Sequence, residues 1–124
     1  MRKLKQLFKK YLRSYPDIAH NQELIILLAF SESSLRYDIK HPKKSIVGIC
    51  GIDKNYWADE LKENGIRINS LKSCEYVLNY YLEQNSGDKK AALRDYKGII
   101  KDKKVGGVVE SILEKEKELK KELK

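Results

Sequence analysis

The residue best placed for acid–base chemistry in this chain is Glu32, a carboxylate at the end of an apolar run. Seven apolar residues, 24–30, precede it, and Ser31 and Ser33 flank it. The run is too short to span a bilayer and too apolar for a one-sided surface helix, so it predicts a buried core segment. Burial and a helix C-terminus both disfavour a charged carboxylate, which suits a proton donor. The structural alternative is that Glu32 simply ends a buried helix by emerging into water.

Residues for other kinds of chemistry are scarce. The two histidines, His20 and His41, have no ligand spacing with the cysteines, so we expect no metal and no cofactor. A nucleophile elbow, a phosphate-binding loop and a dinucleotide fingerprint are missing from the sequence. Carboxylate chemistry remains, with Asp38 and Asp53 as further candidates after Glu32. Glycoside cleavage fits these residues, because an acid must protonate the glycosidic oxygen and aromatic side chains can hold sugar rings.

Composition indicates one small globular domain with a strong basic excess. The chain has 124 residues, is 41% hydrophobic and carries a formal net charge of +8. This charge predicts affinity for a polyanion such as nucleic acid, acidic lipid or an anionic cell-wall polymer. The alternative for the basic N-terminal cluster is a solvated helix face. No membrane span and no signal peptide is visible in the sequence.

The two cysteines give little information by themselves. Cys50 and Cys74 could form one bridge, but a single pair lacks the spacing framework of disulfide-rich domains. We expect them to be free and buried.

Hydrophobic spacing and capping residues predict a mostly α domain. A helix over about 4–12 ends before Pro16, and a second helix, capped by Asp17 or Asn21, carries the apolar run to Glu32. An irregular loop with a short extended piece at 45–47 follows. Three more helices are expected: one ending at Asn64-Gly65, one from Asn69 or Ser70 to about 86, and one from Asp88 to Lys97-Gly98.

The last segment, 104–124, is a strong helix former rich in Glu and Lys. Its apolar face narrows towards Leu119 and Leu123. We therefore expect its end to fray, or alternatively to pair with a partner.

Four blocks, read in their order and spacing, resemble the lysozyme-like lytic transglycosylases, the superfamily of soluble lytic transglycosylase and goose-type lysozyme. Glu32-Ser33-Ser34-Leu35 resembles the family's Glu-Ser-x-aromatic/apolar motif, and Gly48-Ile49-Cys50-Gly51-Ile52 falls where the family has Gly-Leu-Met-Gln-Ile. Asn69 to Tyr76 resembles Asn-Ile-x-x-Gly-x-x-Tyr-Leu, and Ala92 to Tyr96 resembles Ala-Leu-x-x-Tyr. The sequence departs from the family at four positions: Cys50 for Met, Gly51 for Gln, Ser73 for Gly and Lys97 for Asn.

The resemblance implies an α+β lysozyme-like fold, with a single helical domain and a small irregular or β-hairpin loop beside the catalytic cleft. The catalytic domain would span 1–103, with the motif-bearing core at 18–98 and a charged amphipathic helix at 104–124. Glu32 would be the catalytic residue. The substrate-binding residues it implies are Ser33, Ser45, Gly48, Ile49, Cys50, Gly51, Asn69, Tyr76 and Tyr96. Ser33 could orient Glu32, or be an ordinary cap or core residue.

The activity implied is cleavage of the β-1,4 bond between MurNAc and GlcNAc in peptidoglycan, with formation of 1,6-anhydromuramoyl products. One carboxylate suffices for this route, whereas hydrolysis requires a second one to position water. In goose-type lysozymes an Asp follows the Gly-x-Met-Gln-apolar motif, so Asp53 keeps a hydrolytic branch open. The alternative role for Asp53 is an N-cap of the next helix.

Two further classes stay open, a non-catalytic cell-wall module that retains the fold and a basic helical nucleic-acid-binding module. No recognition-helix motif supports the second, so a nucleic-acid partner is not expected. The expected partners are peptidoglycan glycan strands, and with them a secretion apparatus or a phage particle. The expected location is the periplasm or cell wall after export, or a phage.

Overall fold

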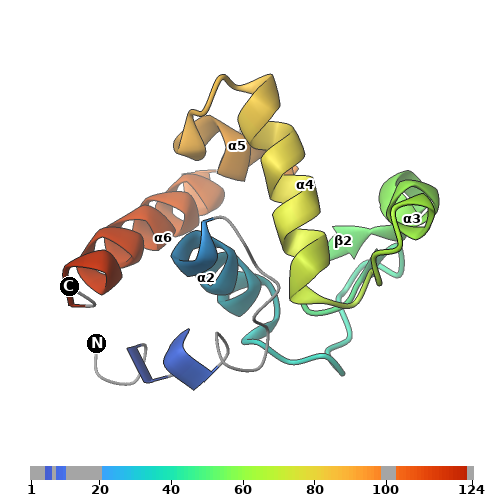
Figure 1. Ribbon diagram of the computed structural model, residues 1–124, viewed down its shortest axis with the longest axis horizontal. Helices are drawn as coiled ribbons and strands as arrows, with labels where there is room; N and C mark the ends of the chain where they lie inside the picture. The colour runs from blue at the N-terminus through green and yellow to red at the C-terminus, as the bar shows by residue number, and fades with distance from the viewer. Residues whose placement is uncertain (1–4, 7, 11–20, 99–102, 123–124) are drawn as a thin grey trace.

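The computed structural model describes residues 5–6, 8–10, 21–98 and 103–122, of which 103–106 and 122 are described by their backbone alone. Helices dominate these residues, and a two-stranded antiparallel sheet accompanies them (Figure 1). This confirms the mostly α class expected from hydrophobic spacing. No helix in these ranges is long and apolar enough to cross a membrane.

One long irregular stretch, 34–45, separates the core helix from the first strand. Of the helix expected at 4–12, residues 5–6 and 8–10 are helical, while its predicted end and the cap at Asp17 lie outside the described residues. The other elements are α2 (Gln22–Ser33), β1 (Ile46–Val47), β2 (Ile52–Asp53), α3 (Lys54–Glu63), α4 (Leu71–Gln84), α5 (Lys89–Tyr96) and α6 (Lys103–Glu122).

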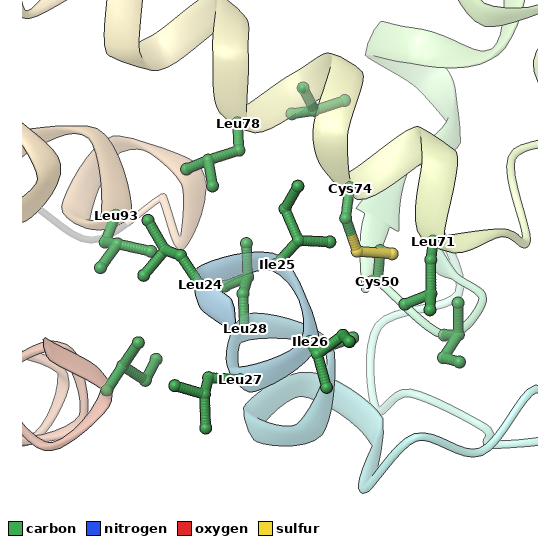
Figure 2. Close-up of a cluster of buried hydrophobic side chains, with 14 of the residues drawn as sticks. Leu24, Ile25, Ile26, Leu27, Leu28, Cys50, Leu71, Cys74, Leu78 and Leu93 are labelled. Atoms are coloured by element: carbon green, nitrogen blue, oxygen red, sulfur yellow. A yellow bond between two sulfur atoms is a disulfide. The ribbon is translucent and has the colours of Figure 1, made fainter. Parts of the chain in front are cut away.

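Helix α2 forms the centre of the core. Its residues 24–29 are buried, and it packs against α4 on one side and α6 on another (Figure 1). Figure 2 shows Leu24, Leu28 and Leu78 gathered between these helices. The apolar run is therefore a buried helix, as predicted, except that Phe30 at its end is 38% exposed. Asn21 occupies the N-cap position, but its side chain makes no capping hydrogen bond.

Side-chain caps start the next three helices. Asp53 accepts a hydrogen bond from the Asn55 backbone N–H in α3, and Ser70 accepts one from Ser73 in α4. Asp88 does the same for Ala91 in α5. Each cap satisfies a backbone donor that the first helical turn leaves without a partner. The predicted starts at Ser70 and Asp88 and the predicted end at Asn64 are confirmed.

The short extended piece predicted near 46 is one strand of a hairpin. β1 pairs antiparallel with β2, with Ile46 opposite Asp53 and Val47 opposite Ile52. The four residues between the strands, 48–51, turn back towards the end of α2. The hairpin thereby brings the second resemblance block next to the first.

The expectation that the end of α6 frays is wrong for the described residues. The helix continues to Glu122, and Leu119 is fully buried. Buried Glu116 also binds the Lys89 ammonium group of α5 at 3.1 Å, which ties the two helices together.

The cysteines are not free. Cys50 and Cys74 form a disulfide, visible in Figure 2, with their Cα atoms 5.5 Å apart. The bond forms because the hairpin turn lies against the first turn of α4, a contact between segments that single-sequence spacing does not reveal. It attaches the turn to the core.

Candidate active site

Glu32 lies in the last turn of α2 and lines a cleft of about 480 Å³. Its side chain is 19% exposed, so the carboxylate is largely buried but open to the cleft. The chain turns away directly afterwards, because Ser34 adopts a left-handed conformation with φ of 55°. The carboxylate thus stands where the buried helix meets the cleft, and it does not project freely into water.

The backbone of Gly51 lies directly against the Glu32 side chain. A Cβ atom at position 51 would lie 2.5 Å from Glu32 Oε2, closer than real Cβ contacts allow. The backbone of Gly51 also has φ of +59°, a conformation that favours glycine. The glycine that stands where the family has Gln therefore leaves the space that the Glu32 side chain occupies.

Replacing Gly51 by Ala should impair the site more than the fold. We expect a loss of about 1–2 kcal/mol in the free energy of unfolding from the left-handed backbone conformation, together with displacement of Glu32 and a marked loss of any Glu32-dependent activity. Gly65→Ala is the matched control, because Gly65 has φ of +68° and nothing within 4 Å of its added Cβ. Chemical denaturation should show destabilisation in both variants, larger at position 51 because displaced Glu32 also leaves Lys97, and an activity assay should show a loss only at position 51. Equal activities would contradict the contact.

Lys97 is a functional candidate that was not predicted as a site residue and that stands where the resembled family has Asn. Its Nζ atom donates to Glu32 Oε1 at 2.7 Å and to Ser31 Oγ at 2.9 Å. The Lys97 side chain is 9% exposed, so the ion pair is largely shielded from water. The only sequence signal is that Lys97 directly follows Tyr96 at the end of the last resemblance block.

Three hydrogen bonds hold the hairpin turn behind the cleft. The Ser33 hydroxyl donates to the Ile49 carbonyl oxygen, the Ile49 N–H donates to Asn69 Oδ1, and the Tyr96 hydroxyl donates to the Cys50 carbonyl oxygen, each at 2.7 Å. Ser33 thus attaches the turn to α2, and no hydrogen bond joins its hydroxyl to Glu32.

The residues implied as substrate-binding therefore divide into groups. Gly51 and Tyr96 line the cleft together with Glu32 and Asp53. Behind the cleft, Ser33, Gly48, Ile49, Cys50 and Asn69 support the turn. Ser45 and Tyr76 do not line the cleft: the Ser45 carbonyl accepts from the Lys54 N–H, and Tyr76 borders a separate hollow beside Glu60.

Asp53 caps a helix and also lines the cleft. Its side chain caps α3 by accepting from the Asn55 N–H at 3.0 Å, which confirms the N-cap interpretation. The same residue also lines the cleft that contains Glu32. The cap engages Oδ1, one of the two carboxylate oxygens. Asp38 lies outside the cleft lining and pairs with exposed Arg36.

Aromatic side chains form one wall of the cleft. Tyr56 is 66% exposed and its ring stands edge-on to buried Trp57, with ring centroids 5.1 Å apart. Trp57 in turn contacts Tyr81, which contacts Tyr96. Buried Trp57 and partly buried Tyr81 and Tyr96 fix the wall, and Tyr56 offers an exposed face of the kind that stacks on sugar rings.

Burial raises the pKa of Tyr96 well above its ordinary value, and the negative charge of Glu32 raises it further. A tyrosine in the unfolded chain, with a pKa of about 10, loses its proton just above that pH, whereas Tyr96 in the native protein keeps its proton. Since the unfolded state then binds fewer protons, this residue makes the protein less stable as the pH rises past about 10.

Tyr96→Phe should remove that alkaline loss. Near neutral pH we expect the variant to be about 1 kcal/mol less stable, because the bond to the Cys50 carbonyl is lost. Between about pH 8 and about pH 11, its free energy of unfolding should fall less than that of the unaltered protein. Denaturant titrations at both pH values measure this, and an equal fall in the two proteins would contradict the buried position of the hydroxyl.

The cleft offers carboxylates, hydroxyl groups and ammonium groups for chemistry. Within the described ranges, no group of three or more His, Cys, Asp or Glu side chains is arranged to hold a metal ion. Comparisons with protein-family models, curated proteins and solved structures give no match to this chain. The fold and site define a mostly α protein in which the Glu32 carboxylate, at the end of the core helix, lines an aromatic-walled cleft.

Proposed function

We propose that this protein is a peptidoglycan-cleaving lytic transglycosylase with a lysozyme-like fold and Glu32 as its catalytic residue. The observation that carries the proposal is the position of Glu32: a largely buried carboxylate at the end of the core helix, facing the glycine of the hairpin turn. The order of a buried helix, a small hairpin beside the cleft and further helices also agrees with the resemblance read from the sequence.

The proposed reaction needs one carboxyl group. Protonated Glu32 gives its proton to the oxygen of the β-1,4 bond between MurNAc and GlcNAc, and that bond breaks. Glu32, now a carboxylate, takes the proton of the muramoyl 6-hydroxyl, whose oxygen bonds to the anomeric carbon of the same sugar. The products are a 1,6-anhydromuramoyl end and a free GlcNAc end, and the carboxyl group regains its proton.

Three other features support a cell-wall substrate. Exposed Tyr56 can stack on a sugar ring, and the net charge of +8 favours an anionic polymer. The disulfide is typical of proteins in oxidising surroundings, which agrees with a periplasmic or cell-wall location or a phage-encoded protein. A secretion apparatus or a phage particle would be the assembly that uses such an enzyme.

Hydrolysis is a second candidate because Asp53 lines the same cleft as Glu32. A second carboxylate could position water for attack on the anomeric carbon, as in goose-type lysozymes. Asp53→Asn separates the two reactions. Asn retains an oxygen that can cap α3, so the variant should fold and keep transglycosylase activity, whereas a hydrolase would lose most of its activity.

A non-catalytic cell-wall module is the third candidate, favoured by the ion pair that occupies Glu32 Oε1. Such a protein would bind peptidoglycan without cleaving it. Binding to purified sacculi with no soluble fragments would favour this candidate.

The proposal is tested by incubating purified sacculi with the protein and identifying the soluble fragments by mass spectrometry. We expect muropeptides with 1,6-anhydro ends. Reducing ends would point to hydrolysis, and the complete lack of released fragments would contradict both enzymatic readings.

A further inference from the structure

We propose that Lys97 is a specificity-determining residue that binds a carboxylate of the peptide-bearing glycan and thereby releases Glu32. This inference rests on the proposed function and names what distinguishes the substrate at that site. The Lys97 ammonium group lines the cleft and reaches Glu32 from the C-cap position of α5.

Lys97 occupies one oxygen of the Glu32 carboxyl group. As long as Lys97 Nζ lies 2.7 Å from Oε1, that oxygen accepts the hydrogen bond of the ammonium group and is not free to approach a glycosidic oxygen. A general acid must lie within hydrogen-bond reach of the oxygen that it protonates. Glu32 can therefore act as an acid only after the ammonium group has taken another partner.

The hydrogen-bond donors of Lys97 indicate which group can replace Glu32. An ammonium group has three N–H donors. Glu32 and Ser31 take two of them, so a ligand in the cleft can first bind the third and then take over the donor that Glu32 holds. The Ser31 hydroxyl itself donates to the Leu28 carbonyl oxygen at 2.6 Å, so it is fixed in place and can stay on Lys97 when Glu32 leaves. A partner strong enough to replace one carboxylate is another carboxylate.

The lining of the cleft has more acidic than basic side chains. It carries three carboxylate residues, Glu32, Asp53 and Asp95, against two lysines, Lys43 and Lys97. Asp95 is bound to the Asn85 amide at 2.9 Å. An anionic ligand is thus not drawn in by the lining as a whole and needs direct contact with a lysine. Lys43 is exposed on the hairpin side, whereas Lys97 lies next to the acid.

Binding of a ligand that lacks the cleavable bond tests the contact separately from catalysis. The ligand is a GlcNAc–MurNAc disaccharide carrying its stem peptide, either with free carboxylates or with the same carboxylates amidated, and calorimetry measures its affinity. We expect the protein to bind the free form about tenfold more tightly, Lys97→Met to bind both forms equally, and Lys97→Arg to regain the preference.

Lys43→Met is the matched control, because it removes an ammonium group from the same cleft without touching Glu32. It should keep the preference for the free form. A preference that survives in Lys97→Met, one that is lost in Lys43→Met instead, or no binding of either form would overturn the proposal.

Cleavage of sacculi provides the second measurement. Amidated sacculi should be cleaved more slowly than native sacculi by the unaltered protein, and at equal rates by Lys97→Met. If the protein shows the Lys97-dependent preference in binding but releases no fragments, the carboxylate contact stands and the proposed activity falls. If it cleaves sacculi but shows no such preference, the activity stands and the carboxylate contact falls.

Discussion

Glu32→Gln should lower the rate of fragment release from peptidoglycan by about 10² to 10⁴-fold, because the amide has no proton to donate to the glycosidic oxygen. The fold should persist, since Gln has nearly the same shape and its oxygen can still accept from Lys97. We expect a stability loss of about 1–3 kcal/mol, since the largely buried Lys97 ammonium group loses its charged partner. Rates on sacculi and denaturant unfolding measure the two effects.

Glu114→Gln is the control for this prediction, because Glu114 lies exposed on α6, outside the cleft lining. It should leave both rate and stability unchanged. If Glu32→Gln retains full activity, Glu32 is not the proton donor of the reaction.

Loss of the disulfide should have the largest effect on stability. Replacing Cys50 and Cys74 together by Ala opens a link between residues 24 apart in sequence. A loop of that size is worth about 3 kcal/mol in the chain-entropy description. In a chain of this length that corresponds to a fall of roughly 10 °C in the melting temperature. Calorimetry or denaturant unfolding gives the value.

The companion measurement is the unfolding of the unaltered protein after its disulfide has been reduced, with the two thiols left unmodified. This reduced protein keeps both sulfur atoms in the core and lacks only the covalent link, so it separates the cross-link from the packing. Because the turn is also held by Ser33, Asn69 and Tyr96, the reduced protein should stay folded at room temperature. A double variant as stable as the oxidised protein would contradict the role of the bond.

Local features of the fold could be predicted because their causes lie within a few residues. Ser70 and Asp88 cap helices by bonding to backbone groups three residues ahead, and a sequence shows that spacing directly. The buried run before Glu32 was equally visible, because its apolar residues leave no polar face. The extended piece at 45–47 was predicted from two β-branched residues in a stretch where glycines and a proline argue against a helix, but its partner strand β2 was not predicted.

Contacts between distant segments could not be predicted in the same way. Lys97 and Glu32 are 65 residues apart, and nothing in either neighbourhood requires them to meet. The resemblance brought Tyr76 into the substrate-binding set, yet the rotation of α4 about its axis places it beside Glu60 and away from the cleft. The departures at Cys50, Gly51 and Lys97 are the positions where the structure adds most: a cross-link, a space for Glu32 and its ion pair.

Digestion of sacculi in heavy-oxygen water tests the central claim most directly. In the proposed reaction the muramoyl 6-hydroxyl attacks the anomeric carbon, so no oxygen from water enters the new end. Mass spectrometry should therefore find anhydro-muropeptides without the heavy isotope, each lighter by one water than the hydrolysis product. One heavy oxygen at each new reducing end would contradict transglycosylation.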